Sequence, residues 1–355
     1  MIWVDLGITI IKIALVFFVV LTLVAYLTLA ERRVSAFMQD RLGPNRVGPF
    51  GLLQPLADGV KFIFKEDIIP RDANKYIYIA APAFSLITAL IALAVVPIGR
   101  GFETTIFGLI QEPIFVKLQI ADINVGVLYI LAIGSLGVYG IVLGGWASNS
   151  KYSFLGGLRA AAQMVSYELA MGISILGIIA WTGSMRLEDI IEAQQHYWFV
   201  FPQILGFIVF LAAVFAETNR LPFDMPEAEP EIVAGYHTEY SSMKFAMFFM
   251  AEYTHMIVMS CLIVALFFGG WYPLPFGGWF GVDIDTHWYL PPIVFVGKVL
   301  AFLFFFIWVR FTLPRFRYDQ VMSLGWKVLF PLAIVNLLII SIAILVMQHY
   351  GVLGF

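Results

Sequence analysis

Apolar stretches of about the length that a helix needs to cross a lipid bilayer recur along the whole chain. Several runs of roughly 20 residues carry no charged side chain or only one, and a helix of roughly 20 residues spans a hydrocarbon core of about 30 Å. We therefore predict an all-α polytopic membrane protein. Its eight transmembrane helices are expected at about 7–30, 76–98, 125–147, 159–183, 199–219, 241–269, 290–312 and 326–348.

The composition favours this fold class over a soluble helical protein with an apolar core. Charged residues make up only 13% of the 355 residues, whereas soluble domains carry about 25%. The single cysteine, Cys261, lies in an apolar run, so the chain offers no disulfide, iron–sulfur cluster or thiolate zinc site of its own. The first run is too long for a signal peptide and lacks a cleavage signature, which predicts a retained helix. Residues 1–355 are predicted to form a single membrane domain.

The lysines and arginines predict the orientation of the helices, because cytoplasmic loops carry an excess of positive charge. On the side of the two termini the connections hold three basic residues, Arg100, Lys117 and Arg186. The connections on the opposite side hold sixteen: Arg32, Arg33, Arg41, Arg46, Lys61, Lys65, Arg71, Lys75, Lys151, Arg159, Arg220, Lys244, Arg310, Arg315, Arg317 and Lys327. Both termini are therefore predicted to face outward, and the connection 216–240 inward.

The first inward connection is expected to contain a short two-faced helix over residues 50–65. One helical face carries Leu52, Leu56, Val60 and Ile63, and the other carries Gln54, Asp58, Lys61 and Lys65. Such a helix lies in the membrane interface rather than across the membrane. It is either a surface anchor or one wall of an opening into the bilayer.

The stretch 31–46 before this helix is basic and ends in glycine–proline turns. Its arginines at 32, 33, 41 and 46 would face anionic lipid, a partner subunit or a polar ligand. The arginines and aspartates clustered beside an interfacial helix favour a lined cavity.

Four glutamates lie inside the predicted spans or at their ends. Glu168 and Glu252 are deep, with His255 one turn after Glu252 on the same face, while Glu31 and Glu217 end spans. A charge inside a bilayer costs roughly 2.5–3.5 kcal/mol, and neither deep span offers a Lys or Arg close to its glutamate. We predict proton-relay carboxyls that desolvation keeps neutral until a neighbouring charge changes. The alternative is a set of structural acids, each satisfied by a partner.

The connection 216–240 is unusually acidic for the basic side of the membrane. It holds a single arginine, Arg220, against six acids: Glu217, Asp224, Glu227, Glu229, Glu231 and Glu239. Solubility alone does not require so many acids in a loop between two membrane helices, so this connection is predicted to be functional.

Seven stretches, in order along nearly the whole chain, resemble one family. They are 31–33 (ERR) with 39–41 (QDR), 43–66 (GPNRVGPFGLLQPLADGVKFIFKE), 145–153 (GWASNSKYS), 159–168 (RAAAQMVSYE), 216–224 (AETNRLPFD), 248–256 (FFMAEYTHM) and 314–322 (PRFRYDQVM). The family is the quinone-chamber membrane subunit of proton-pumping NADH:quinone oxidoreductase, or respiratory complex I. Its members carry the letter H in bacteria and the number 1 in mitochondria.

The resemblance implies roles for particular residues. The interfacial helix and the first and sixth spans would frame a quinone entrance, and the quinone path would include Arg32, Arg33, Arg41 and Asp58. The proton-coupling carboxylates would be Glu168, Glu217, Glu227, Glu229, Glu231 and Glu252. No residue of this chain is implied to be catalytic by itself or to bind a metal.

The resemblance also implies partners, cofactors and location. The chain would form the quinone chamber with a peripheral iron–sulfur subunit and would act on antiporter-like membrane subunits. Quinone would be the substrate, whereas FMN and iron–sulfur clusters would belong to partner subunits, and no cofactor is expected in this chain alone. We expect contact with membrane lipid, no contact with nucleic acid, and location in the bacterial inner membrane, with the mitochondrial inner membrane as the alternative.

Other functions remain open at this stage. A homologous membrane subunit of a hydrogenase- or ferredoxin-linked ion-pumping complex need not hold quinone, and bound nickel in the assembly would identify the hydrogenase. A stand-alone ion transporter would also use deep glutamates, but the sequence lacks the repeats or broken-helix pairs of such transporters. A passive membrane anchor would leave the deep carboxyls unexplained.

Overall fold

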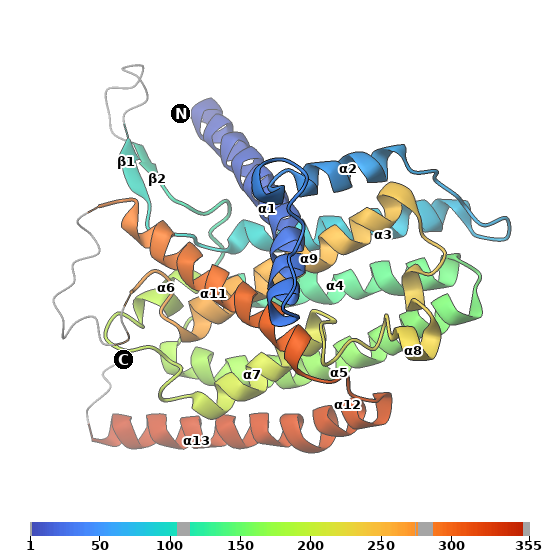
Figure 1. Cartoon of the computed structure of the whole chain (residues 1–355). Helices are drawn as coiled ribbons and strands as arrows, with labels where there is room; N and C mark the ends of the chain where they lie inside the picture. The colour runs from blue at the N-terminus through green and yellow to red at the C-terminus, as the bar shows by residue number, and fades with distance from the viewer. Residues whose placement is uncertain (1, 105–113, 274, 276–286, 351–355) are drawn as a thin grey trace.

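A computed structural model describes residues 2–104, 114–273, 275 and 287–350, and these residues are mostly helical (Figure 1). The α-helices are α1 (Ile2–Met38), α2 (Gln54–Phe64), α3 (Lys75–Ala92), α4 (Gly126–Ala147), α5 (Lys151–Thr182), α6 (Leu187–Glu192), α7 (Ile204–Glu217), α8 (Glu229–Ile232), α9 (Ser242–Phe267), α11 (Leu290–Thr312), α12 (Tyr318–Leu324) and α13 (Phe330–His349). The 3₁₀ turns are η1 (Pro49–Gly51), η2 (Leu93–Val95) and η3 (Gly235–His237), and a π-helical turn, η5 (Gly325–Leu329), joins α12 to α13.

The described strands are confined to one small hairpin. Its strands β1 (Phe102–Thr104) and β2 (Ile114–Val116) run antiparallel, with Phe102 opposite Val116. The predicted all-α polytopic class is confirmed.

Seven described helices are long and apolar enough to cross a membrane: α1, α3, α4, α5, α9, α11 and the continuous stretch Tyr318–His349. The fifth predicted span, 199–219, contains only the 14 residues of α7. At 1.5 Å per residue α7 reaches roughly 21 Å, which is less than a hydrocarbon core of about 30 Å.

Two helices extend beyond their predicted limits. Helix α1 continues to Met38 because glycine and proline are absent from the chain between Glu31 and Gly43. Arg32 and Arg33 therefore stand on this helix and not in the connection after it. Helix α5 begins at Lys151 rather than near 159, and it ends where Gly183 adopts a left-handed conformation with φ of 70°.

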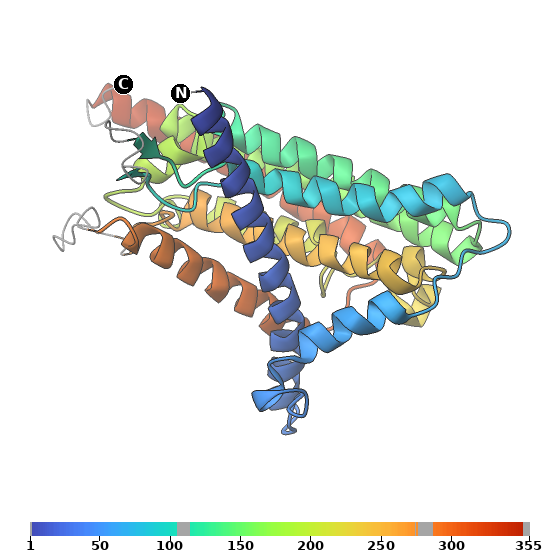
Figure 2. The ribbon, with the colours of Figure 1, turned by 90° about the horizontal axis from the view of Figure 1, so that it is seen from above.

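Helix α9 lies at the centre of the bundle and α1 at its edge. Within the apolar 18-residue stretch of α9, 78% of the residues are buried, whereas in the corresponding stretch of α1 only 11% are buried. Helix α3 packs against α4 and α9, α5 packs against α4, α7 and α13, and α11 packs against α9. Helix α1 crosses these helices steeply, and α2 begins near the C-terminal end of α1 (Figure 2).

The bundle has two ends with different connections. The start of α1, the end of α13, the β hairpin and α6 lie at the left of Figure 1. The connections α2–α3, α4–α5 and α7–α9 lie at the opposite end, at the right of the same view. This places the acidic connection beside the loop that follows α2.

Candidate functional site

A lateral cavity of about 510 Å³ lies between α1, α2, α9 and α11. Its walls are largely apolar, with Leu21 and Val24 on α1, Phe62 on α2 and Phe249 on α9. The charged and phenolic groups that line it are Glu31, Arg32, Asp58, Tyr253 and Arg310. An apolar chamber with a few converging polar groups is the usual form of a site for a small amphipathic molecule.

Two of the four predicted quinone-path residues meet at this cavity. Nη1 of Arg32 lies 2.7 Å from Oδ2 of Asp58, which joins α1 to α2. Arg33 donates a hydrogen bond to the carbonyl of Phe50, and the exposed Arg41 donates to the side chain of Gln39. Neither Arg33 nor Arg41 lines the lateral cavity.

A buried network of charges lies at one side of the lateral cavity. Tyr253 donates a hydrogen bond of 2.5 Å to Glu31, and Arg310 donates another to the same carboxylate. Nη1 of Arg220 lies 3.4 Å from Glu31, and its guanidinium carbon lies 4.3 Å from the centroid of the Tyr253 ring. Glu31 therefore lies between two arginines, which favour its ionised form.

The same arginine contacts one of the deep glutamates. Nε of Arg220 lies 2.8 Å from Oε1 of Glu252, and only 5% of the Arg220 side chain is exposed. The span that carries Glu252 offers no base near it, as expected, but a base does reach it from elsewhere in the chain. The base comes from the acidic connection, which folds back onto α9, and not from the span that carries Glu252.

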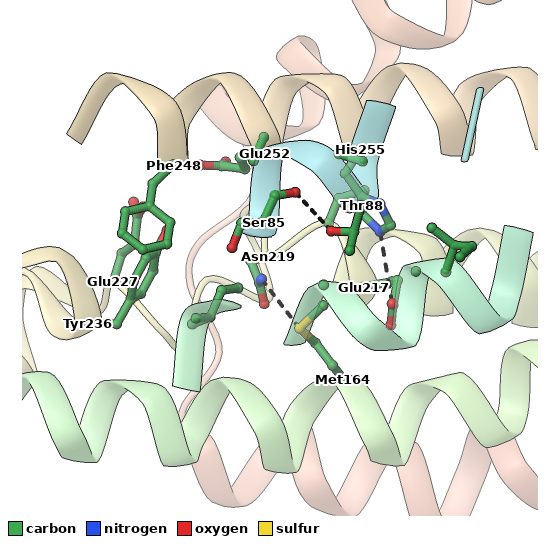
Figure 3. Close-up of a pocket in the computed structure, with 17 residues that line it drawn as sticks. Ser85, Thr88, Met164, Glu217, Asn219, Glu227, Tyr236, Phe248, Glu252 and His255 are labelled. Atoms are coloured by element: carbon green, nitrogen blue, oxygen red, sulfur yellow. Dashed lines mark hydrogen bonds and ion pairs between the residues drawn. The ribbon is translucent and has the colours of Figure 1, made fainter. Parts of the chain in front are cut away.

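A second, inner cavity of about 60 Å³ lies on the other side of Glu252 (Figure 3). It is lined by Glu217, Glu227, Glu252 and His255, together with Ser85, Thr88, Asn219 and Tyr236. One water molecule needs roughly 10–15 Å³ of such volume. The inner cavity therefore has room for several water molecules among groups that can exchange protons.

Glu217 is the least compensated acid of the inner cavity. Its side chain is 2% exposed, and its nearest described charge partner is His255, whose Nε2 lies 3.9 Å from Oε1. Among the described residues, Oε2 of Glu217 and Nε2 of His255 have no hydrogen-bond partner. A buried carboxyl in this state costs free energy unless it is protonated or hydrated.

Glu168 lies outside the set of residues that line the inner cavity but close to it. Ser135 donates a hydrogen bond to Glu168. The carboxylates of Glu168 and Glu217 are close enough to repel each other when both are ionised. The structure thus brings Glu168, Glu217 and Glu252 into one region, but it pairs only Glu252 with an arginine.

The acids of the connection between α7 and α9 are mostly paired. Nε2 of His237 lies 3.1 Å from Oε1 of Glu227, Arg315 lies 2.6 Å from Asp224, and Arg159 lies 2.5 Å from Glu231. The side chain of Glu229, which is also a predicted proton-coupling residue, lies outside the described part of the chain.

Burial and pairing act in opposite directions on these acids. Burial raises the pKa of Asp224 to about 6; repulsion from Glu227 adds to this shift, while Arg315 opposes it. Burial alone would also raise the pKa of Glu227, but His237, Arg220 and Arg310 together outweigh burial and hold that pKa below its usual value. Two carboxyls in one loop therefore differ in their readiness to bind a proton.

Sequence reasoning missed the basic and phenolic members of this site. Arg220 was noted only as the single base among six acids, and that isolation was itself a signal that it compensates buried charge. Tyr253 follows Glu252 directly, and Arg310 lies in the last turn of α11. A position beside an acid in the sequence, or at a helix end, does not indicate a role in the site until the fold is known.

Comparisons with known proteins agree on one family. The model of the NADH dehydrogenase family matches residues 11–341. A bacterial H-type membrane chain of NADH-quinone oxidoreductase, from Geobacter metallireducens, is 54% identical over 336 residues, covering 94% of this chain and 96% of the relative. A protein of the same name from Cytophaga hutchinsonii is 50% identical, covering 93% of this chain and 94% of the relative.

The relatives extend beyond bacteria. "NADH-ubiquinone oxidoreductase chain 1" of Chondrus crispus is 50% identical over 332 residues, covering 93% of this chain and 95% of the relative. Both the family match and the coverage extend over nearly the full length of the chain. The chain belongs to the NADH dehydrogenase family of membrane oxidoreductase subunits.

Proposed function

We propose that this chain is the membrane subunit of NADH:quinone oxidoreductase that admits quinone and couples its reduction to proton translocation. The quinone would enter the lateral cavity from the bilayer between α1, α2 and α9. A peripheral iron–sulfur subunit would complete the chamber, and antiporter-like membrane subunits would receive the signal. FMN and iron–sulfur clusters would be held by partners, in the bacterial inner membrane or its mitochondrial counterpart.

One observation supports this proposal: a single buried arginine, Arg220, contacts one acid of each cavity. Arg220 contacts Glu31, which lines the lateral cavity, and Glu252, which lines the inner cavity. A change of charge in the lateral cavity therefore acts on the inner cavity through one side chain. A purely structural ion pair would not require a cavity on both sides.

The electrostatic interactions of Arg220 are strong enough to couple the two cavities. Quinone reduction to quinol takes up two electrons and two protons, so the completed reaction adds no net charge. The charge in the lateral cavity changes while the electrons have arrived and the protons have not. Two unit charges 4 Å apart interact by about 4 kcal/mol at an effective dielectric constant near 20. A change of about 1.4 kcal/mol moves a protonation equilibrium tenfold. The free energy is sufficient to change the protonation of Glu252 and then of the uncompensated Glu217.

The decisive experiment replaces Glu217 with glutamine in the assembled complex, reconstituted in liposomes. We expect proton pumping and quinone reduction to fall on the order of 10²-fold, the lower end of what one positioned proton-transfer group contributes. NADH oxidation by a soluble artificial acceptor, which bypasses the membrane, should be unchanged.

The matched control is Glu192→Gln, an exposed glutamate at the end of α6, on the opposite end of the bundle from the acidic connection. This variant should retain both activities. If Glu217→Gln pumps protons at the normal ratio and rate, Glu217 has no part in coupling and the proposed relay through the inner cavity is wrong.

A further inference from the structure

His237 contacts residues that line both cavities, although it lines neither cavity itself. It ends η3, and only 10% of its side chain is exposed. On one side its ring packs against Phe245 and Phe249, with ring centroids 5.3 and 5.9 Å away, and both phenylalanines line the lateral cavity. On the other side it faces Glu227, which lines the inner cavity.

We propose that His237 is a positioning residue that holds Glu227 at the inner cavity and releases it when His237 loses its proton. This inference rests on the proposed function, because it concerns how the same two cavities communicate. Arg220 is permanently charged, and His237 would add a second contact between the cavities whose charge changes with pH. His237 would act through Glu227 and would not itself contact quinone.

The contacts of the ring support a role for its charge rather than for packing alone. Besides Glu227, the His237 ring packs against the aromatic side chains of Tyr236, Phe245 and Phe249. Three aromatic rings surround the His237 imidazole, and its Nε2 lies 3.1 Å from one carboxylate without the alignment of a hydrogen bond. An apolar side chain would fill the same space, so a histidine is needed here only for its polar atoms.

The surrounding charges make this histidine the adjustable member of the cluster. The carboxylates of Glu227 and Glu252 favour the protonated form of His237. The guanidinium groups of Arg220 and Arg310 favour the ionised form of Glu227. Arginine keeps its charge at any physiological pH, whereas histidine changes charge near neutrality. Burial lowers the pKa of His237, but Glu227 and Glu252 outweigh burial and hold it above the usual value.

The sign of the pH effect follows from this balance. Below its raised pKa, His237 is a cation and Glu227 is held as a carboxylate. As the pH rises through that pKa the cation is lost, and Glu227 is free to move or to take up a proton. Coupled turnover is therefore expected to fall on the alkaline side because His237 titrates.

The test compares two variants in the assembled complex with a matched control. His237→Gln keeps a neutral donor beside Glu227, and His237→Phe keeps the ring but removes every polar atom. The control is His196→Gln, an exposed histidine after α6. Quinone reduction and proton pumping are measured from acid to alkaline pH, and assembly is measured by the amount of complex purified.

We expect His237→Phe to lower coupled turnover roughly tenfold, the effect of removing a charged partner of Glu227 when that contact contributes about 1.4 kcal/mol. His237→Gln should retain more activity, and its alkaline fall should disappear. The control should keep the wild-type profile. A His237→Gln profile that superimposes on the wild type after scaling overturns the inference, and this readout remains if the Phe variant does not assemble.

The outcomes separate this inference from the proposed function. If Glu217→Gln stops pumping while both His237 variants follow the wild-type pH profile, only the role of His237 is rejected. If Glu217→Gln pumps normally, the relay itself is rejected, whatever the His237 variants do.

Discussion

Asp224 lies in the acidic connection, buried beside Arg315, and its carboxyl has a pKa raised to about 6. We predict that it takes up a proton as the pH falls through about 6, giving a carboxylic acid band in the infrared difference spectrum. Asp224→Asn should lack this band. Since Arg315 favours the ionised form, Arg315→Gln should move the band to higher pH.

Asp319, an exposed carboxyl on α12, provides the control, because Asp319→Asn should leave the band unchanged. The raised pKa of Asp224 also determines how folding stability changes with pH. The folded protein binds this proton more tightly than the unfolded chain, so Asp224 disfavours folding as the pH rises above its ordinary pKa toward about 6. A titration that is the same with and without Arg315 would contradict the assignment.

At this scale the sequence predicts which acids lie in spans or at their ends, because an acid in a span is rare, but not how far each is buried or which base it contacts. Glu252 is expected deep in a span and Glu217 at the end of one, yet the Glu217 side chain is 2% exposed and that of Glu252 14%. Arg220 lies more than thirty residues before Glu252 in the sequence. Their contact depends on how the connection folds back, and no local pattern encodes that path.

The contact between α5 and η3 gives a prediction at the scale of elements. A Cβ added to Gly156 would lie 2.6 Å from the backbone nitrogen of Tyr236, whereas one added to Gly157 would lie no closer than 3.4 Å to its neighbours. Alanine gains about 1 kcal/mol over glycine in a helix, and overpacking costs roughly 1–3 kcal/mol. Gly156→Ala should therefore destabilise the protein, and Gly157→Ala should be neutral or stabilising.

Thermal unfolding of the purified membrane part of the complex would measure both variants side by side. Because Gly156 touches η3, its alanine variant should also disturb His237 and lower coupled turnover. Equal melting temperatures for the two variants would mean that η3 moves away from α5 without cost.

Helix type and approximate position were predictable from hydropathy, but helix ends were not. Helices α1 and α5 continue beyond their apolar runs because polar residues such as Arg32 and Arg159 are compatible with a helix that leaves the membrane. Helix α7 is shorter than its predicted span, and it ends at Glu217. Apolar content defines what lies in lipid, whereas turn residues and packing define where a helix stops.

At the scale of the whole molecule, the lateral cavity could not be derived from composition. It requires α1 to cross the bundle steeply while α2, α9 and α11 close its other sides. The two-faced pattern of residues 50–65 left open whether that helix is an anchor or a wall. The structure places Asp58 and Phe62 of α2 in the lining of the cavity, which makes α2 a wall of it.

The orientation of the whole molecule is the last prediction, and under the proposed function it determines from which side protons are taken up. The start of α1 and the end of α13 share one end of the bundle, opposite the α4–α5 connection. Native Cys261 is buried, so single cysteines placed at the exposed Tyr350 and Lys151 report the two ends. A membrane-impermeant maleimide should label position 350 in cells with a permeable outer membrane, and position 151 only after the inner membrane is opened. The reverse pattern would place the acidic connection outside and would contradict the proposed uptake of protons from the cytoplasm.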